Sequence, residues 1–103
     1  MDKKTDKSVK EYKQKIKKEF PDSKIILFGS RARGDNLEES DYDIIIISKE
    51  FKNIKTPKRL EKVYKHWNNK LNADIIPYTP EEYENWSQYL TIARKAKKEG
   101  IVI

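Results

Sequence analysis

Several residue types are scarce in this sequence: its 103 residues include no cysteine, one histidine and three glycines. Without cysteine, the chain can form neither a disulfide framework nor a thiolate zinc site. Its longest apolar runs, residues 25–28 and 44–47, are far shorter than the ~20 residues of a membrane-spanning helix, which excludes such a helix. No apolar stretch follows the first residues, so we expect no secretory signal and a cytoplasmic location.

Charge, by contrast, is abundant. The 23 Lys and Arg residues outnumber the 17 Asp and Glu residues, which gives a net charge of +6, and 39% of the residues are charged. A chain of this length is expected to form a single domain, residues 1–103, with residues 1–6 disordered. The positive balance favours a polyanionic partner, which could be a nucleic acid, a nucleotide or an acidic protein.

The N-terminal segment is predicted to be a lysine-rich amphipathic helix, because apolar residues recur in it at helical spacing until Pro21 ends the pattern. Acidic residues interrupt its basic run, and aromatic residues are few there beyond Tyr12. This pattern favours a solvated helix face and argues against direct nucleic-acid binding. The apolar positions are Val9, Tyr12, Ile16 and Phe20.

The remaining pattern predicts an α/β domain, in which helices flank a small sheet. We predict strands at residues 24–28, 44–47, 73–78 and 101–103, with Pro77 marking a strand end or a sheet edge. Residues 49–55 are a polar connection. A helix is predicted near residues 57–70, with Thr56 as its N-cap. A last helix begins at a capping box of Thr79 and Glu82 and ends at Gly100.

Three carboxylates are candidates for chemistry. Asp41 and Asp43 stand two residues apart at the start of a predicted strand, so they project from the same face. Carboxylates so placed repel each other, and Mg²⁺ would relieve the repulsion because it prefers oxygen ligands. Asp74 stands near the start of another predicted strand and can complete the cluster if the two strands are neighbours. Alternatively, the two aspartates simply precede a strand in a solvated loop.

A glycine-serine turn follows the first predicted strand. Gly29 and Ser30 would present backbone N–H groups and a hydroxyl at the start of a helical turn, an arrangement that favours phosphate binding. Arg31 and Arg33 add positive charge beside it, and an arginine can donate two parallel hydrogen bonds to a phosphate. The phosphate-binding loop of P-loop proteins is absent, because Asp35 stands where that motif requires lysine.

The turn and the carboxylates together resemble the signature of polymerase-β-like nucleotidyltransferases: Gly29-Ser30, ten further residues, then Asp41-x-Asp43. The sequences Phe-Gly-Ser-Arg-Ala-Arg-Gly and Ser-Asp-Tyr-Asp-Ile closely resemble those of the minimal nucleotidyltransferases, or MNT proteins. The resemblance extends from residue 25 to the C-terminal residues 100–103. It implies the polymerase-β-like fold, with a small mixed sheet whose carboxylates cluster at one edge of the active cleft.

The resemblance also implies an activity: transfer of a nucleoside monophosphate from an NTP, here ATP, to an acceptor hydroxyl. Asp41, Asp43 and Asp74 match the family's catalytic aspartates and metal ligands, which implies a site for two Mg²⁺ ions. Asp74 would also help to deprotonate the acceptor. Gly29 and Ser30 match the nucleotide-binding turn, and Arg33 lies where a basic residue would meet the triphosphate. His66, the only histidine, is expected to be a surface residue.

The resemblance further implies a protein partner. MNT proteins are paired with HEPN-domain ribonuclease toxins, and the MNT member acts as an antitoxin that transfers AMP to a tyrosine of the toxin. This is the function we expect. The alternatives are a nucleotidyltransferase that modifies a small molecule or another protein, and an inactive MNT domain that neutralises a HEPN partner by binding alone.

The net charge is unevenly distributed with respect to the candidate site. The stretch from residue 29 to residue 43 is acidic on balance, with two arginines against five acidic residues. Its affinity for a polyphosphate should therefore depend on metal ions. The excess of positive charge lies in the N-terminal lysines and near the C-terminus, where we expect it to serve solubility or partner docking. The C-terminal cations are Arg94, Lys95, Lys97 and Lys98.

Overall fold

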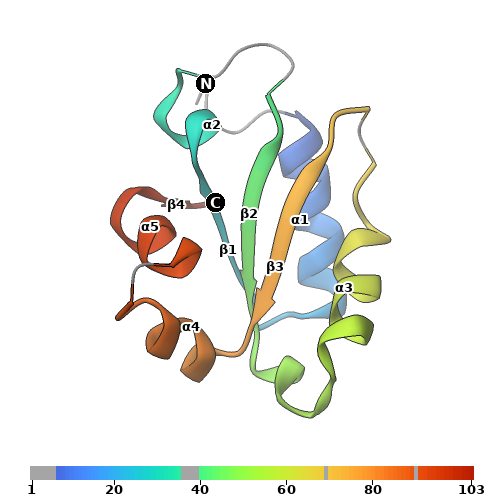
Figure 1. Ribbon diagram of the computed structural model, residues 1–103. Helices are drawn as coiled ribbons and strands as arrows, with labels where there is room; N and C mark the ends of the chain where they lie inside the picture. The colour runs from blue at the N-terminus through green and yellow to red at the C-terminus, as the bar shows by residue number, and fades with distance from the viewer. Residues whose placement is uncertain (1–6, 36–39, 69, 90) are drawn as a thin grey trace.

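A four-stranded sheet forms the centre of the protein (Figure 1). The computed structural model describes residues 7–35, 40–68, 70–89 and 91–103, so the expected disorder of residues 1–6 lies outside it. Strand β1 (Lys24–Phe28) lies between β2 (Tyr42–Ile47) and β4 (Ile101–Val102) and is antiparallel to both. Strand β3 (Ala73–Tyr78) pairs with β2 in parallel. The predicted mixed sheet is therefore confirmed.

Helices cover both faces of this sheet (Figure 1). Helices α1 (Lys7–Glu19) and α3 (Thr56–Tyr64) lie on one face, and α4 (Pro80–Trp86) and α5 (Ile92–Glu99) lie on the other. The short helix α2 (Ser30–Arg33) follows β1 directly. Strand β2 leads into a 3₁₀ helix, η1 (Lys49–Asn53), which buries Phe51 within the segment expected to be a polar connection.

Alternate strand residues point to opposite faces of the sheet. The larger apolar core lies on the α1/α3 face. Helix α1 buries the apolar stripe that the sequence predicts, and its Tyr12 hydroxyl donates a hydrogen bond of 2.7 Å to the carbonyl of Val63 in α3. The opposite face has a smaller apolar cluster, formed with α4 and α5. The first cluster includes Ile16, Ile25, Leu27, Ile44, Ile46 and Ile75, and the second Ile26, Phe28, Ile45, Ile47 and Ala96.

Strand β3 is an edge strand, as Pro77 predicts. The carbonyls of Asn72 and Tyr78 accept hydrogen bonds from the N–H groups of Tyr42 and Ser48, so the backbone polar groups of residues 73, 75 and 77 point away from β2. The hydroxyl of Tyr64 accepts the outward N–H of Ile75 at 2.9 Å, and Pro77 has no N–H to offer. This edge is therefore blocked against the addition of another strand.

Helix α3 is shorter than predicted. It ends at Tyr64 instead of near residue 70, and it begins at Thr56, with Lys55 as N-cap in place of the predicted Thr56. Trp67 lies beyond the helix, yet its ring packs against Tyr12 and Tyr42, with ring centroids 5.4 and 5.0 Å away. Trp67 is partly buried against the core although it lies after the end of α3. Its apolar side chain at helical spacing therefore led to the prediction of a longer helix.

The segment predicted as one last helix is two helices. The predicted capping box of Thr79 and Glu82 is present at the start of α4, which ends at Trp86. The hydroxyl of Thr91 then donates to the Trp86 carbonyl at 2.7 Å and accepts the N–H of Arg94, so it closes α4 and caps α5. A side-chain cap within the apolar pattern thus restarts the helix, and Gly100 ends it as predicted.

A buried arginine fixes α4 against α3. Arg59 donates to both carboxylate oxygens of Glu82, at 2.6 and 3.3 Å, and to the carbonyl of Ile54. The same Glu82 carboxylate accepts the backbone N–H of Thr79, which completes the capping box. Burial alone would raise the pKa of Glu82, but the hydrogen bonds from Arg59 and Thr79 outweigh it and lower the pKa.

The junction between α5 and β4 leaves no room for a side chain at Gly100. A Cβ there would lie 2.4 Å from the Ala96 carbonyl oxygen and 2.5 Å from Ile26 Cγ2. We expect Gly100→Ala to lower the free energy of unfolding by about 1–3 kcal/mol through overpacking. Urea denaturation would measure this loss, with exposed Lys98→Ala on the same helix as the control; equal midpoints for both variants would contradict the prediction.

Glu19 links α1 to α3 electrostatically. Its carboxylate contacts His66 Nε2 at 2.8 Å, Lys62 Nζ at 3.3 Å and Lys65 Nζ at 3.4 Å. Burial raises the pKa of Glu19, but these three partners outweigh it, and the net shift is downward. His66 is therefore occupied in this ion-pair cluster, where α1 meets the segment after α3.

A carboxyl with a lowered folded-state pKa stabilises the fold above its unfolded-state pKa, and the stabilisation is lost as the pH falls through the folded-state pKa. We expect Glu19→Gln to cost about 1 kcal/mol of unfolding free energy at pH 7 and to reduce the loss of stability between about pH 5 and pH 3. Thermal unfolding across this range would test the prediction. Parallel pH profiles for the variant and the natural chain would refute it.

Candidate active site

Two of the candidate aspartates are direct neighbours in the sheet. Asp43 in β2 and Asp74 in β3 are register partners on parallel strands, so their side chains project from the same face, the one covered by α4 and α5. Strand β2 begins at Tyr42, earlier than predicted, which places Asp43 inside the ladder. Asp41 precedes the strand and is exposed, as is Asp74, whereas Asp43 is half-buried.

Gly29 lies against the carboxylate of Asp43. It follows Phe28, the residue of β1 that pairs with Asp43. A Cβ on Gly29 would lie 2.3 Å from Asp43 Oδ2, and its φ of 75° and ψ of −159° belong to a region that only glycine readily adopts. Glycine is therefore required here twice, once for the backbone turn and once for the space that the carboxylate occupies.

The predicted glycine-serine turn forms a single helical turn beside this carboxylate. The Gly29 carbonyl accepts hydrogen bonds of 3.1 Å from the N–H groups of both Ala32 and Arg33, and the left-handed Gly34 closes the turn onto the Ser30 carbonyl. The first N–H groups of a helix have no carbonyl partner within it, and they favour an anion such as a phosphate. The turn therefore places potential phosphate donors next to Asp43.

Burial and like charge both disfavour the ionised form of Asp43. Burial raises its pKa most, and the neighbouring carboxylates of Asp74 and Asp41 raise it further. Lys95 and Arg33 act in the opposite direction but do not cancel the increase. Negative charge at this end of the sheet is therefore undercompensated by the protein itself.

A divalent cation fits this chemistry, because hard cations bind carboxylate oxygens and would offset the repulsion. Within residues 7–35, 40–68, 70–89 and 91–103, however, no three His, Cys, Asp or Glu side chains are gathered closely enough to hold a metal ion. The assignment of Asp41, Asp43 and Asp74 as Mg²⁺ ligands stays a prediction.

The two arginines after the turn have different partners. Arg33 pairs with Asp35 at 3.2 Å and with Glu99 of α5 at 3.1 Å, and these carboxylates raise its pKa. Its predicted contact with a triphosphate would require exchange of these partners. Arg31 donates to the Ser40 carbonyl at 3.0 Å and stacks over the Tyr42 ring at 3.9 Å, which holds the segment around Asp41.

Sequence reasoning missed Lys95 and Glu99 as neighbours of the site. Lys95 was grouped with the C-terminal cations, which are distant in sequence from the carboxylates, and Glu99 was assigned no role. Strand β4 returns the chain to β1, and this brings α5 beside the site, where Glu99 pairs with Arg33 and Lys95 lowers the pKa of Asp43. No local signal in the sequence reveals a contact between elements so far apart.

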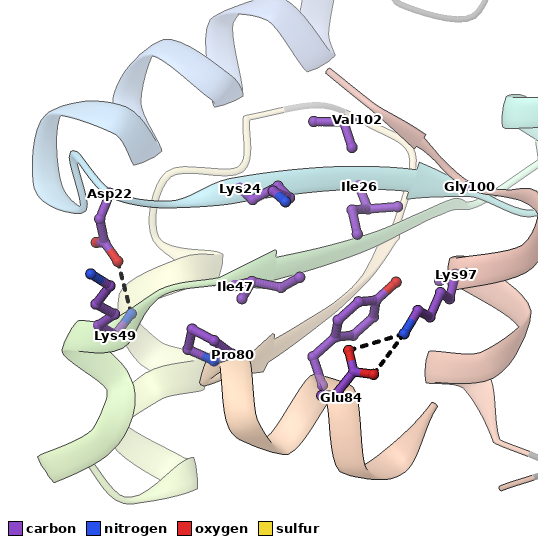
Figure 2. Close-up of a pocket in the computed structure, with 12 residues that line it drawn as sticks. Asp22, Lys24, Ile26, Ile47, Lys49, Pro80, Glu84, Lys97, Gly100 and Val102 are labelled. Atoms are coloured by element: carbon purple, nitrogen blue, oxygen red, sulfur yellow. Dashed lines mark hydrogen bonds and ion pairs between the residues drawn. The ribbon is translucent and has the colours of Figure 1, made fainter. Parts of the chain in front are cut away.

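A pocket of about 460 Å³ lies on the same sheet face but at its other end (Figure 2). It lies near Lys24 and Ile47, which pair at the end of the β1–β2 ladder opposite Asp43. Ile47 is four residue steps along the strand from Asp43, or about 13 Å. In Figure 2, Lys97 is paired with Glu84, at 2.9 Å. None of Asp41, Asp43 and Asp74 lines this pocket, so it is separate from the carboxylates.

Among the described residues, no helix is both long enough and apolar enough to cross a membrane.

Comparison with known proteins identifies the family. Residues 9–103 match the model of the nucleotidyltransferase domain. Two proteins of Methanocaldococcus jannaschii, both named "Putative protein adenylyltransferase", are similar to the chain. One is 38% identical over 67% of this chain and 72% of its own length, and the other is 50% identical over 41% of this chain and 44% of its own.

The fold has a counterpart among solved structures. A crystal structure of a putative nucleotidyltransferase from Sulfolobus solfataricus matches with a TM-score of 0.69 and 29% sequence identity, over 93% of this chain and 76% of the other. The match supports the polymerase-β-like arrangement inferred from the glycine-serine turn and the paired aspartates. With the family model covering most of its length, this chain belongs to the nucleotidyltransferase-domain family and is a nucleotidyltransferase.

Proposed function

We propose that the protein is a Mg²⁺-dependent adenylyltransferase that moves AMP from ATP to a hydroxyl group of an acceptor protein. The observation that carries the proposal is the placement of Asp43 and Asp74 in register beside the Gly29 turn. Phosphate donors and carboxylates thus share one end of the sheet. The names of the two similar Methanocaldococcus proteins support both AMP as the group transferred and a protein as acceptor.

Each residue has a role in this reaction. Asp41, Asp43 and Asp74 would hold Mg²⁺, which when bound stabilises charge on the attacking and leaving oxygens. The turn at Gly29 and Ser30 would bind the phosphates of ATP. The acceptor oxygen forms a bond to the α-phosphorus, the bond to the bridging oxygen breaks, and pyrophosphate leaves. Asp74, exposed at the strand edge, would accept the hydroxyl proton.

We propose a tyrosine of a HEPN-family ribonuclease toxin as the acceptor, so that the protein acts as an antitoxin in the cytoplasm. Exposure of Asp41 and Asp74 supports a bulky acceptor, because a side chain on another protein can reach them from solvent. The test is incubation of this protein with ATP, Mg²⁺ and a purified HEPN-family ribonuclease. Mass spectrometry should detect added AMP on a tyrosine, and a chelator should abolish it; no addition under these conditions would contradict the proposal.

The role of Asp43 can be separated from its effect on folding. We expect Asp43→Asn to lower the rate of AMP transfer by about 100-fold or more, equivalent to ~2.7 kcal/mol of transition-state stabilisation. The variant should unfold at the same or a higher temperature, because it removes a half-buried charge that its neighbours repel. Near-natural transfer by the folded variant would remove Asp43 from the catalytic site.

Gly29 and Gly34 form a matched pair for testing the turn. Both have positive φ, but a Cβ at Gly34 meets nothing within 4 Å, whereas one at Gly29 meets the Asp43 carboxylate. Both Gly→Ala variants should lose about 1–3 kcal/mol of stability from backbone strain. Gly29→Ala should in addition lower transfer by about tenfold or more, since the displaced carboxylate no longer aligns with the turn.

Calorimetric titration with ATP and Mg²⁺ would show whether the effect of Gly29→Ala begins at nucleotide binding. Equal transfer rates for the Gly29 and Gly34 variants, measured at a temperature where both are folded, would separate the turn from catalysis.

A further inference from the structure

Three exposed apolar residues lie close together in sequence around the α4–α5 connection. The exposed fractions of Trp86, Tyr89 and Ile92 are 46%, 55% and 51%. The rings of Trp86 and Tyr89 pack against each other, with centroids 6.3 Å apart and planes at 61°. Large side chains of this kind, held at the surface, are typical of interaction sites.

Local hydrogen bonds hold the backbone around Trp86 and Tyr89. The Trp86 carbonyl accepts the Tyr89 N–H at 3.1 Å and the Thr91 hydroxyl at 2.7 Å. Ser87 is buried beneath it and donates to the Glu84 carbonyl. These hydrogen bonds hold Trp86 and Tyr89, so binding a partner through them costs less conformational entropy than binding through freely rotating side chains.

Helix α5 connects this patch to the active site. Ile92, Lys95 and Glu99 follow one another at spacings of three and four residues, so they line one side of the helix. Glu99 on this side pairs with Arg33, the last residue of α2, at 3.1 Å. The side that exposes Ile92 is therefore the side whose C-terminal end contacts α2.

The solvent-exposed part of α5 is basic. Arg94, Lys95 and Lys98 are all exposed; Lys95 lies 4.0 Å from Glu99, and Lys97 is paired with Glu84. The exposed side of α5, with Trp86 and Tyr89 before it, thus combines aromatic and aliphatic side chains with three cations, of which Lys95 is paired with Glu99. A partner complementary to it carries apolar and acidic side chains together.

We propose that this α4–α5 surface, formed by Trp86, Tyr89, Ile92, Arg94, Lys95 and Lys98, docks the acceptor protein through an acidic segment that bears aromatic or aliphatic residues. The inference rests on the proposed transfer to a protein hydroxyl. The acceptor docks through side chains and not by strand addition at β3, because that edge is blocked by Tyr64 and Pro77. Docking here places the acceptor along α5. The C-terminal end of α5 contacts the helical turn that follows Gly29, through the ion pair of Glu99 with Arg33.

The test measures binding without ATP, so that it does not depend on catalysis. The probe is a fluorescein-labelled peptide that contains tyrosine, leucines and several Asp and Glu residues, compared with the same peptide carrying lysines at the acidic positions. Fluorescence anisotropy should show that the natural chain prefers the acidic peptide by about tenfold or more. Trp86→Ala, Ile92→Ser and Arg94→Glu should each weaken binding about fivefold or more.

Val102→Ser is the matched control, because Val102 is a similarly exposed apolar residue on β4, next to the separate pocket of Figure 2. It should leave peptide affinity within about twofold. The three surface variants should keep their affinity for ATP with Mg²⁺.

Three results would overturn the proposal: no binding of the acidic peptide up to about 1 mM, equal binding of both peptides, or equal losses in the control. Tighter binding of a single-stranded oligonucleotide, lost in the same variants, would assign the surface to nucleic acid instead. Peptide binding that survives while every tested acceptor stays unmodified would refute the proposed reaction and leave the docking surface standing.

Discussion

The site depends on one steric constraint, the absence of a side chain at Gly29. Because no Cβ is present, the Asp43 carboxylate can lie against the end of β1, in space that any other residue would fill. The same glycine has the backbone conformation that turns the chain from β1 into α2. Gly29 therefore joins the phosphate-binding turn to the carboxylates. This explains why the glycine-serine pair and the two aspartates indicate a nucleotidyltransferase site only in combination.

The two faces of the sheet have different roles: one supports the strands and the other carries the candidate aspartates. The α1/α3 face is closed by the larger core and by the Tyr12 hydrogen bond, so β1 and β2 are fixed from behind. The α4/α5 face has the smaller apolar cluster, and it carries Asp43 and Asp74 at the starts of β2 and β3. A rigid support behind two strands allows charged groups to be held close together at their exposed ends, although they repel each other.

The sequence alone could predict the parts of the site that lie close together in the chain. Apolar runs located the strands, and the fixed spacing of Gly29, Asp41 and Asp43 identified the family. Pairing of Asp74 with Asp43 could only be conditional, because a parallel pairing depends on how the whole chain folds. The break at Thr91 was missed because a side-chain cap within a continuous apolar pattern resembles the interior of a helix.

The charge distribution shows why the sequence near the motif does not predict the electrostatics of the whole site. The stretch around the motif is acidic, and the net charge of +6 arises elsewhere in the chain. Gly100 permits close packing of α5 against β1, and the two-residue strand β4 then fixes the helix beside the site. Through this packing, Lys95 partly offsets the carboxylates and Glu99 holds Arg33. The basic C-terminal region thus contributes to the electrostatics of a site from which it is remote in sequence, and the same helix presents its remaining cations to a partner.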